Sequence, residues 1–292
     1  MKHGALSGEF IGTAGRRIFL LLREPAEVVD GRGSVLVVPP FGEEMNKSRR
    51  MVAETAQRLC ESGVAVVTPD LFGTGDSEGG FREADVDRWV DDLATTCRYA
   101  ESRAMPVKAI LAVRLGCALA VAAQRSGALP AVEASAWWQP VLDGKRHVAQ
   151  FLRLRVAGGS MRGDDPETVD ELRRRSAAGE TLTVAGYELS SALLKGIEGL
   201  SVEALPTGSG KLHWYEIVRD AEAAAPLPAA RFVERARAGG STVSLVTVAG
   251  EPFWASTEIV RLPTLVEHTA AALAGGRATS PGRRASESRA NA

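Results

Sequence analysis

Short, continuous apolar runs alternate along the chain with segments whose apolar residues recur every three or four positions. The runs are mostly β-branched and aliphatic, and they cover residues 18–22, 34–38, 64–67, 107–113, 212–218 and 243–248, with a shorter one around Phe10 and Ile11. Runs of this length are typical of strands that are buried on both faces, as in a parallel sheet. We therefore predict strands at these segments.

Helical patterns occupy segments between the runs, at residues 46–60, 86–99 and 116–124. In 86–99 the apolar residues are spaced by three and four positions, which gives one apolar stripe. Segment 116–124 is small and apolar nearly all round, as expected for a helix that is buried against a sheet. Alternating strands and helices predict a doubly wound α/β fold.

Residues 144–206 interrupt this alternation. They contain three helical patterns, at 147–155, 167–175 and 190–198, and Ser190 or Ser191 is placed to cap the last one. We expect a helical insertion that covers one edge of the sheet, within a single domain of residues 1–274. Residues 275–292 are rich in Arg, Ser, Ala and Gly without an apolar pattern, so we expect a disordered tail.

Composition narrows the functional classes. The 292 residues are 45% hydrophobic, and 35 Lys and Arg balance 36 Asp and Glu, which argues against nucleic-acid binding. No apolar run reaches the roughly 18–20 residues of a membrane helix. The first residues lack the apolar segment of a signal peptide, so we expect a cytoplasmic protein. The three isolated cysteines predict free thiols, and the four histidines, none of them paired at ligand spacing, predict no metal site. We expect no cofactor.

Three loops hold the candidate chemistry, because ligands of open α/β sheets bind at the carboxyl ends of the strands. Each follows a predicted strand: residues 39–50 (PPFGEEMNKSRR), 69–79 (PDLFGTGDSEG) and 112–116 (AVRLG). Together these loops resemble the α/β-hydrolase superfamily over about residues 9–274. The resemblance implies that Pro39–Gly42 forms part of an oxyanion hole and that 112–116 is the nucleophile elbow. It also matches residues 70–77 to the superfamily's D-x-x-G-x-G-x-S loop.

More narrowly, the sequence resembles the exosortase A system-associated hydrolase 2 family. The stretches that carry this resemblance are 39–50, 138–144, 150–153, 185–190 and 248–254. The resemblance implies an association with exopolysaccharide and protein-sorting loci of Gram-negative bacteria. The family's name records its fold and does not establish a reaction.

The residues depart from the superfamily's catalytic pattern. Arg114 stands where the nucleophile is expected, and a guanidinium is always protonated near neutral pH and cannot attack a carbonyl. The stretch 249–258, where the general base is expected, contains no histidine. Only the acid position has a candidate, Asp220. Because the Ser-His-Asp mechanism needs all three groups, we expect that this triad is absent.

Arg114 has two interpretations. It is either a structural residue paired with a nearby carboxylate, or an anion-binding residue on the floor of a pocket. An unpaired buried guanidinium costs several kcal/mol, so both interpretations require a partner. The candidates are Glu43, Glu44 and Glu251.

Other residues near the strand ends also have two interpretations. Glu43 and Glu44 form an acid/base pair, or they favour the dipole of a helix that Asn46 or Ser48 caps. Cys117 is interpreted as a small buried hydrophobe, because no histidine is placed to activate it. Phe41 is a ligand-binding candidate. Trp137, Trp138 and Trp254 are core residues, or they line an apolar pocket suited to an acyl chain or a sugar face.

Two functions follow from these patterns. The first is a non-catalytic protein that binds a small molecule or a partner in an exopolysaccharide or exosortase pathway. The second is an ester or acyl hydrolase with a non-standard site, in which Glu43 or Glu44 activates water and Arg114 stabilises an oxyanion.

Overall fold

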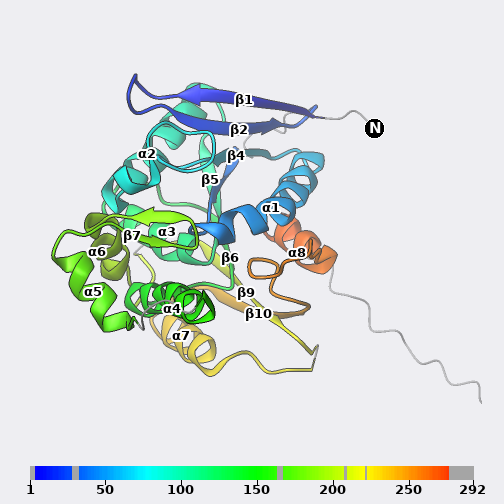
Figure 1. The fold of residues 1–292 in the computed structure, drawn as a ribbon. Coiled ribbons are helices and arrows are strands. Elements are labelled where there is room, and N and C mark those ends of the chain that lie inside the picture. Colours follow the sequence, from blue (N-terminus) through cyan, green and yellow to red (C-terminus); the bar gives the residue numbers. More distant parts are fainter. Residues whose placement is uncertain (1–3, 28–32, 163–166, 207–208, 221, 276–292) are drawn as a thin grey trace, which may run out of the picture.

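An eight-stranded sheet runs through the centre of the protein, with helices on both of its faces (Figure 1). The computed structural model describes residues 4–27, 33–162, 167–206, 209–220 and 222–275. In spatial order the strands are β1 (Ala5–Ile11), β2 (Ile18–Glu24), β4 (Ala65–Pro69), β3 (Ser34–Val38), β5 (Val107–Val113), β6 (Ala134–Trp138), β9 (Lys211–Val218) and β10 (Val243–Ala249). Strand β2 runs antiparallel to β1 and β4, and the other adjacent pairs in this sheet are parallel.

The predicted strands are confirmed, and sequence reasoning missed one strand of the central sheet. That strand is β6, which pairs in parallel with β5 on one side and β9 on the other. Its sequence, ASAWW, has no β-branched residue, and Trp137 and Trp138 are its last two residues, at its carboxyl end as predicted. Both indoles are buried. Burial of these two large rings in the sheet stabilises the strand, in place of the β-branched side chains that mark the other strands.

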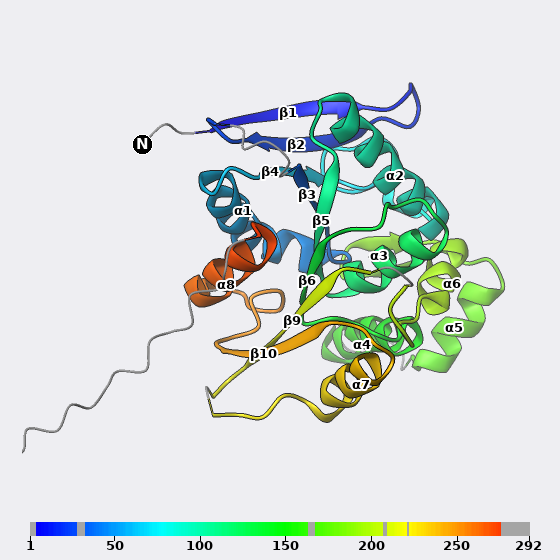
Figure 2. The ribbon, with the colours of Figure 1, turned by 180° about the vertical axis from the view of Figure 1, so that it is seen from behind.

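The helices divide between the two faces of the sheet. On one face lie α1 (Glu43–Glu61) and α8 (Pro263–Leu273), which pack against each other. On the other lie α2 (Val86–Ser102), α3 (Leu115–Arg125) and α7 (Leu227–Ala238), together with a short 3₁₀ turn, Phe81–Glu83 (Figure 2). The buried apolar side chains accordingly form two clusters, one on each side of the sheet. Helices on both faces are what continuous apolar strands require.

Helix α1 begins at Glu43, three residues before the predicted start. Its N-cap is Gly42, whose φ of 58° favours glycine, and no side chain caps the helix. The prediction that Asn46 or Ser48 caps this helix is therefore wrong. Glu43 and Glu44 lie within the first turn, where carboxylates favour the helix dipole.

Residues 144–206 form the helical insertion, which we call the cap. It contains α4 (Gly144–Arg162), α5 (Val169–Ala177), the hairpin of β7 (Leu182–Val184) and β8 (Tyr187–Leu189), and α6 (Ser191–Gly199). As predicted, Ser190 caps α6, because its hydroxyl accepts the N–H of Leu193 at 3.1 Å. The hairpin was not predicted. It turns through Ala185 and Gly186 with φ of 49° and 87°, as two-residue hairpin turns require.

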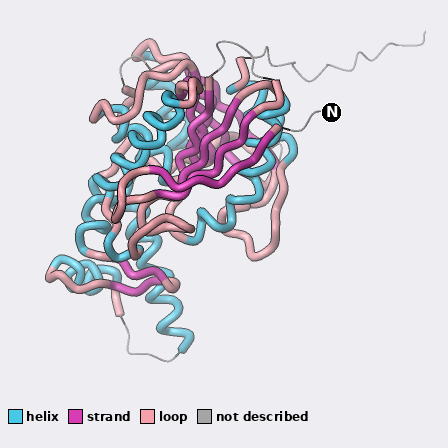
Figure 3. Tube along the Cα trace, turned by 90° about the horizontal axis from the view of Figure 1, so that it is seen from above, coloured by secondary structure: helices cyan, strands magenta, loops and turns pink. Residues whose placement is uncertain are grey.

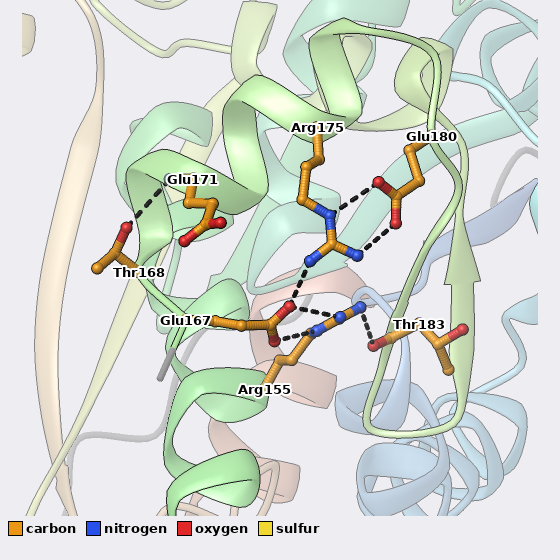
Figure 4. A network of polar contacts seen from close by, with 7 residues as sticks. All are labelled: Arg155, Glu167, Thr168, Glu171, Arg175, Glu180 and Thr183. Atoms are coloured by element: carbon orange, nitrogen blue, oxygen red, sulfur yellow. Dashed lines mark hydrogen bonds and ion pairs between the residues drawn. The ribbon is translucent and has the colours of Figure 1, made fainter. Parts of the chain in front are cut away.

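A polar network holds the cap together (Figure 4). Glu167, just before α5, accepts hydrogen bonds from Arg155 of α4, at 2.7 and 2.8 Å, and from Arg175 of α5. Arg175 also binds Glu180 in the loop that leads to β7. Because one carboxylate joins two arginines from different helices, the network fixes α4 relative to α5.

Two further expectations concern the chain as a whole. Within the described residues, no helix combines the length and the apolar character needed to cross a membrane. Apart from Gly275, the predicted disordered tail lies outside the described residues.

Candidate functional site

The site is built around the sharp bend between β5 and α3. Figure 3 shows the strands of the sheet in magenta, with helices in cyan beside them. Arg114 occupies this bend with φ 55° and ψ −119°, a conformation that costs a side-chain-bearing residue about 1–3 kcal/mol. Its N–H donates to the carbonyl of Trp138 at 3.0 Å. At Gly116, a Cβ would lie 2.5 Å from the carbonyl oxygen of Val38. The small residue predicted at this position therefore lets α3 approach β3.

Three groups hold the guanidinium of Arg114. Glu44 lies along one edge, with its oxygens 3.0–3.3 Å from Nε and Nη2. The carbonyl of Gln139 accepts a hydrogen bond from Nη1 at 3.0 Å. The indole of Trp254 covers the face, with its ring centroid 4.9 Å from Cζ. The Arg114 side chain is left only 16% exposed.

The dipoles of α1 and α3 act in opposite ways on the two charges of this pair. A cation at the N-terminus of α3 opposes the helix dipole, whereas a carboxylate in the first turn of α1 is favoured by it. Burial raises the pKa of Glu44, and the guanidinium of Arg114 partly counteracts this. The pair neutralises itself inside the site, so each residue depends on the other for its partner.

Of the three predicted carboxylate partners, the structure brings only Glu44 to Arg114. Glu43, next to it in the chain, points to the cap, where its carboxylate accepts the hydroxyl of Tyr187 at 3.0 Å and the amide of Asn46 at 3.2 Å. Glu251 is exposed, and no ion pair joins it to another of the described residues. Glu251 is therefore not the carboxylate that pairs with Arg114.

Phe41 lies at the centre of an aromatic cluster that closes the site from the cap side. Its ring centroid is 5.0–6.1 Å from those of four other rings, which are Phe81, Trp89, His147 and Phe151. Tyr187 joins the cluster through Phe81, at 5.0 Å. The cavity beside Phe41, which Gly42, Leu115 and Gly116 also line, has a volume of about 20 Å³. That space holds about one water molecule, so the protein's own side chains fill the place of a ligand.

The loop that follows β10 contributes Trp254 and no histidine. Phe253 and Trp254 are both buried, and their rings meet edge to face at 5.1 Å. Phe253 also packs on Trp138 at 5.7 Å, and Lys47 of α1 donates to the carbonyl of Ala255 at 3.2 Å. These contacts place an indole against Arg114 at the position where the superfamily resemblance implies a general base.

Asp220, the candidate acid, makes no hydrogen bond or ion pair with the described residues at the bend. It is exposed and accepts the N–H of Glu222 at 3.0 Å, within the loop after β9. A turn residue of this kind needs no catalytic explanation, and the prediction that Asp220 occupies the acid position is not supported by any contact with the bend.

Sequence reasoning missed a buried carboxylate, Glu216, which lies on β9. It is 4% exposed and accepts the indole N–H of Trp214 at 2.7 Å. Burial raises its pKa, and hydrogen bonds from Trp214 and Gln139 and the charge of Arg114 counteract this. A charged residue inside an otherwise apolar strand was the available indication, because such a residue needs a polar partner when buried.

His147 was also missed. It lies in α4 of the cap, where its ring packs edge to face on Phe41 at 5.8 Å. The side chain is buried, and its Nε2 has no hydrogen-bond partner among the described residues. Burial first, and then the charge of Arg114, lower the pKa of His147 to about 4. It is therefore a neutral ring near the bend, with no serine or cysteine bonded to it.

Two remaining predicted groups have structural environments. Cys117 is fully buried, and burial raises the pKa of its thiol well above the ordinary value. Asp70, in the 70–77 loop, accepts the N–H of Asp76 at 3.0 Å and lies beside Arg49 at 3.3 Å. A Cβ at Gly75 would lie 1.8 Å from the Asp70 carboxylate, so this loop closes on its own aspartate. Among the described residues, no group of His, Cys, Asp and Glu side chains is arranged to hold a metal ion.

Comparisons with known proteins support the architecture. No protein-family model matches the sequence, and no curated protein matches it. Among solved structures, Est1E from Butyrivibrio proteoclasticus with ferulic acid bound is similar, with a TM-score of 0.63 and 16% identity over 91% of this chain and 96% of that one.

Two further structures show the same likeness. The esterase domain of a Rhodothermus marinus protein has a TM-score of 0.58 and 19% identity, over 93% of this chain and 97% of that one. An alpha-beta serine hydrolase homologue from Coxiella burnetii has a TM-score of 0.55 and 12% identity, over 92% and 96%. At these identities the likeness concerns the fold. The protein therefore has the α/β-hydrolase fold, with a mostly parallel sheet between two layers of helices.

Proposed function

We propose that this protein is a non-catalytic member of its fold, lacking the Ser-His-Asp triad, and that it serves as a binding or accessory protein in an exopolysaccharide or exosortase pathway. The observation that carries the proposal is the state of Arg114. The residue in the elbow is a permanent cation, and Glu44, Gln139 and Trp254 already hold it. A guanidinium in this position cannot be acylated.

The closed pocket also supports a non-catalytic role. Sites for small molecules typically measure about 300–1,000 Å³, whereas the cavity beside Phe41 measures about 20 Å³. An acyl or glycan ligand therefore enters only if the cap moves away from Phe41. The free thiols of Cys60, Cys97 and Cys117 support the further proposal that the protein acts in the cytoplasm.

A labelling assay tests this proposal. The full chain is incubated with a fluorophosphonate probe and with short-chain aryl esters, beside an active serine esterase as the positive control. We expect neither labelling nor turnover above the buffer rate. Arg114→Ser is the matched variant, and it is expected to stay unlabelled, because the loop after β10 carries no histidine to activate the new hydroxyl.

Two results would overturn the proposal. Labelling of the wild-type chain would show that a nucleophile exists elsewhere. Turnover that disappears in Glu43→Gln or Glu44→Gln, in proteins whose melting curves show that they are folded, would establish the water-activating mechanism instead.

A further inference from the structure

Strand β1 is the outermost strand at one side of the sheet. It pairs with β2 alone, in an unbroken antiparallel register from Ala5 opposite Glu24 to Ile11 opposite Ile18. No described element lies beyond β1 in Figure 1 or Figure 2. The backbone N–H and C=O groups along its outer edge therefore have no strand partner among the described residues, and such a row is a template for another strand.

The side chains of this edge are unusually apolar. Leu6 and Phe10 are 56% and 57% exposed, and with Gly8 between them they lie on one face of the strand, because alternate residues share a face. Phe10 packs edge to face on Phe19 of β2 at 5.4 Å. Natural edge strands are usually protected by lysine, proline or a bulge. β1 contains none of these features.

The single charged residue of β1 is already engaged within its own protomer. Glu9 lies on the opposite face from Leu6 and Phe10, where it accepts the hydroxyl of Tyr99 at 2.6 Å and a guanidinium N–H of Arg103 at 3.4 Å. These two partners, together with Ser7, hold the pKa of Glu9 below its ordinary value although burial acts against them. Glu9 therefore does not place a free charge on the open edge.

We propose that β1 pairs in antiparallel orientation with β1 of a second copy of this chain, about a two-fold axis that passes through Gly8. This register places Leu6 opposite the partner's Phe10 and Ser7 opposite the partner's Glu9. An isologous contact of this kind is self-complementary, since each exposed apolar residue meets the other one. Pairing over the seven residues adds about six to eight backbone hydrogen bonds and joins the two sheets.

Neighbouring registers are less favourable. An axis through Glu9 places the two Glu9 carboxylates directly opposite each other, and like charges in that position are destabilising. An axis through Ser7 places Phe10 opposite the partner's Gly4, so the exposed aromatic ring loses its apolar contact. The axis at Gly8 therefore avoids the repulsion between the two Glu9 carboxylates and keeps the apolar contact between Leu6 and Phe10. Because β1 is complementary to itself in this register, we expect a second copy of the chain at this edge.

The first test is the mass of the full chain in solution, measured by sedimentation velocity and light scattering from micromolar concentration upward. We expect reversible association to twice the monomer mass. Phe10→Lys places two cations at the contact and is expected to weaken association at least tenfold, with an unchanged melting temperature because the side chain is exposed. Ile259→Lys is the matched control, since Ile259 is 79% exposed in the loop before α8, and it is expected to dimerise normally.

Cross-linking tests the register. When Leu6→Cys and Phe10→Cys proteins are mixed under mild oxidation, we expect a covalent dimer that contains one of each, whereas neither variant alone cross-links at β1. A chain that stays monomeric at all concentrations overturns the proposal. So does a dimer that survives Phe10→Lys, one that Ile259→Lys disrupts, or cross-linking of Leu6→Cys with itself.

Discussion

Glu44 binds Arg114 along one edge of its guanidinium, with Oε1 3.0 Å from Nη2 and 3.2 Å from Nε. The two side chains come from opposite sides of the carboxyl edge of the sheet, from the first turn of α1 and the residue before α3. The side chains of Glu44 and Arg114 are 22% and 16% exposed, so water cannot take the place of either partner. This ion pair occupies the elbow of a hydrolase fold and ties two helices together.

Removal of either partner alone leaves a partly buried charge, so Arg114→Met and Glu44→Leu are each expected to lower the free energy of unfolding by about 2–3 kcal/mol. The double variant is expected to recover most of this loss, because no charge is then left unpaired. Urea unfolding of the four proteins measures the coupling. Arg58→Gln is the control, since its pair with Glu267 is exposed and contributes about 0–1 kcal/mol. Additive losses in the double variant would contradict the pairing.

His147 makes the protein sensitive to acid. Its pKa is about 4 in the folded protein against 6.5 for an ordinary histidine. Below pH 6.5 the unfolded chain therefore binds a proton that the folded protein excludes, and stability is lost as the pH falls from 6.5 to about 4, by roughly 3 kcal/mol. In His147→Phe this loss is expected to disappear. Unfolding curves at several pH values measure it, and His268→Gln, on the exposed face of α8, should behave as the wild type.

Asp92 has the opposite effect. Burial raises its pKa from 3.8 to about 6, although its carboxylate accepts the N–H of Phe72 at 2.7 Å. The stability that this group contributes is present below pH 3.8 and is lost as the pH rises through about 6. Asp92→Asn keeps an acceptor for Phe72 without the charge, and it is expected to gain roughly 2–3 kcal/mol at pH 8 and nothing at pH 3.5. An equal change at both pH values would rule out ionisation as the cause.

Because the pH ranges of His147 and Asp92 overlap, their effects oppose each other in the wild type. The unfolding free energy of His147→Phe should rise as the pH falls from 6 to 4, and that of Asp92→Asn should fall. Opposite slopes in the two variants are the diagnostic result.

Phe41 is the residue on which closure of the pocket depends. Phe41→Ala removes the ring that contacts Phe151 at 5.0 Å and Phe81 at 5.7 Å, and it is expected to lower stability by about 3–4 kcal/mol. The enlarged cavity should bind small aromatic molecules, which calorimetry measures. Phe10→Ala removes a ring of the same size from an exposed position, so it should cost little and create no site.

Much of the fold could be predicted from the sequence. The strands at 34–38 and 107–113 are confirmed, and their continuous apolar runs correspond to burial on both faces of the sheet. The strands at 18–22 and 243–248 are also confirmed, although they are only partly buried. The β6 strand and the β7–β8 hairpin were not predicted. Their stability comes from buried tryptophans and from a two-residue turn, which leave no periodic pattern in the sequence.

The sequence by itself determined which residue stands at the elbow, and hence that a permanent cation replaces a nucleophile there. It could not decide which carboxylate pairs with Arg114, because Glu43 and Glu44 are adjacent in the chain. Helix α1 begins at Glu43, and this start directs Glu44 toward the bend and Glu43 toward Tyr187. The sequence predicted Trp254 near the strand ends, but it did not show that Trp254 covers Arg114 or that His147 and Glu216 lie near that bend. They come from the cap, β9 and the loop after β10, and only the packing of these distant segments brings them to the same edge of the sheet.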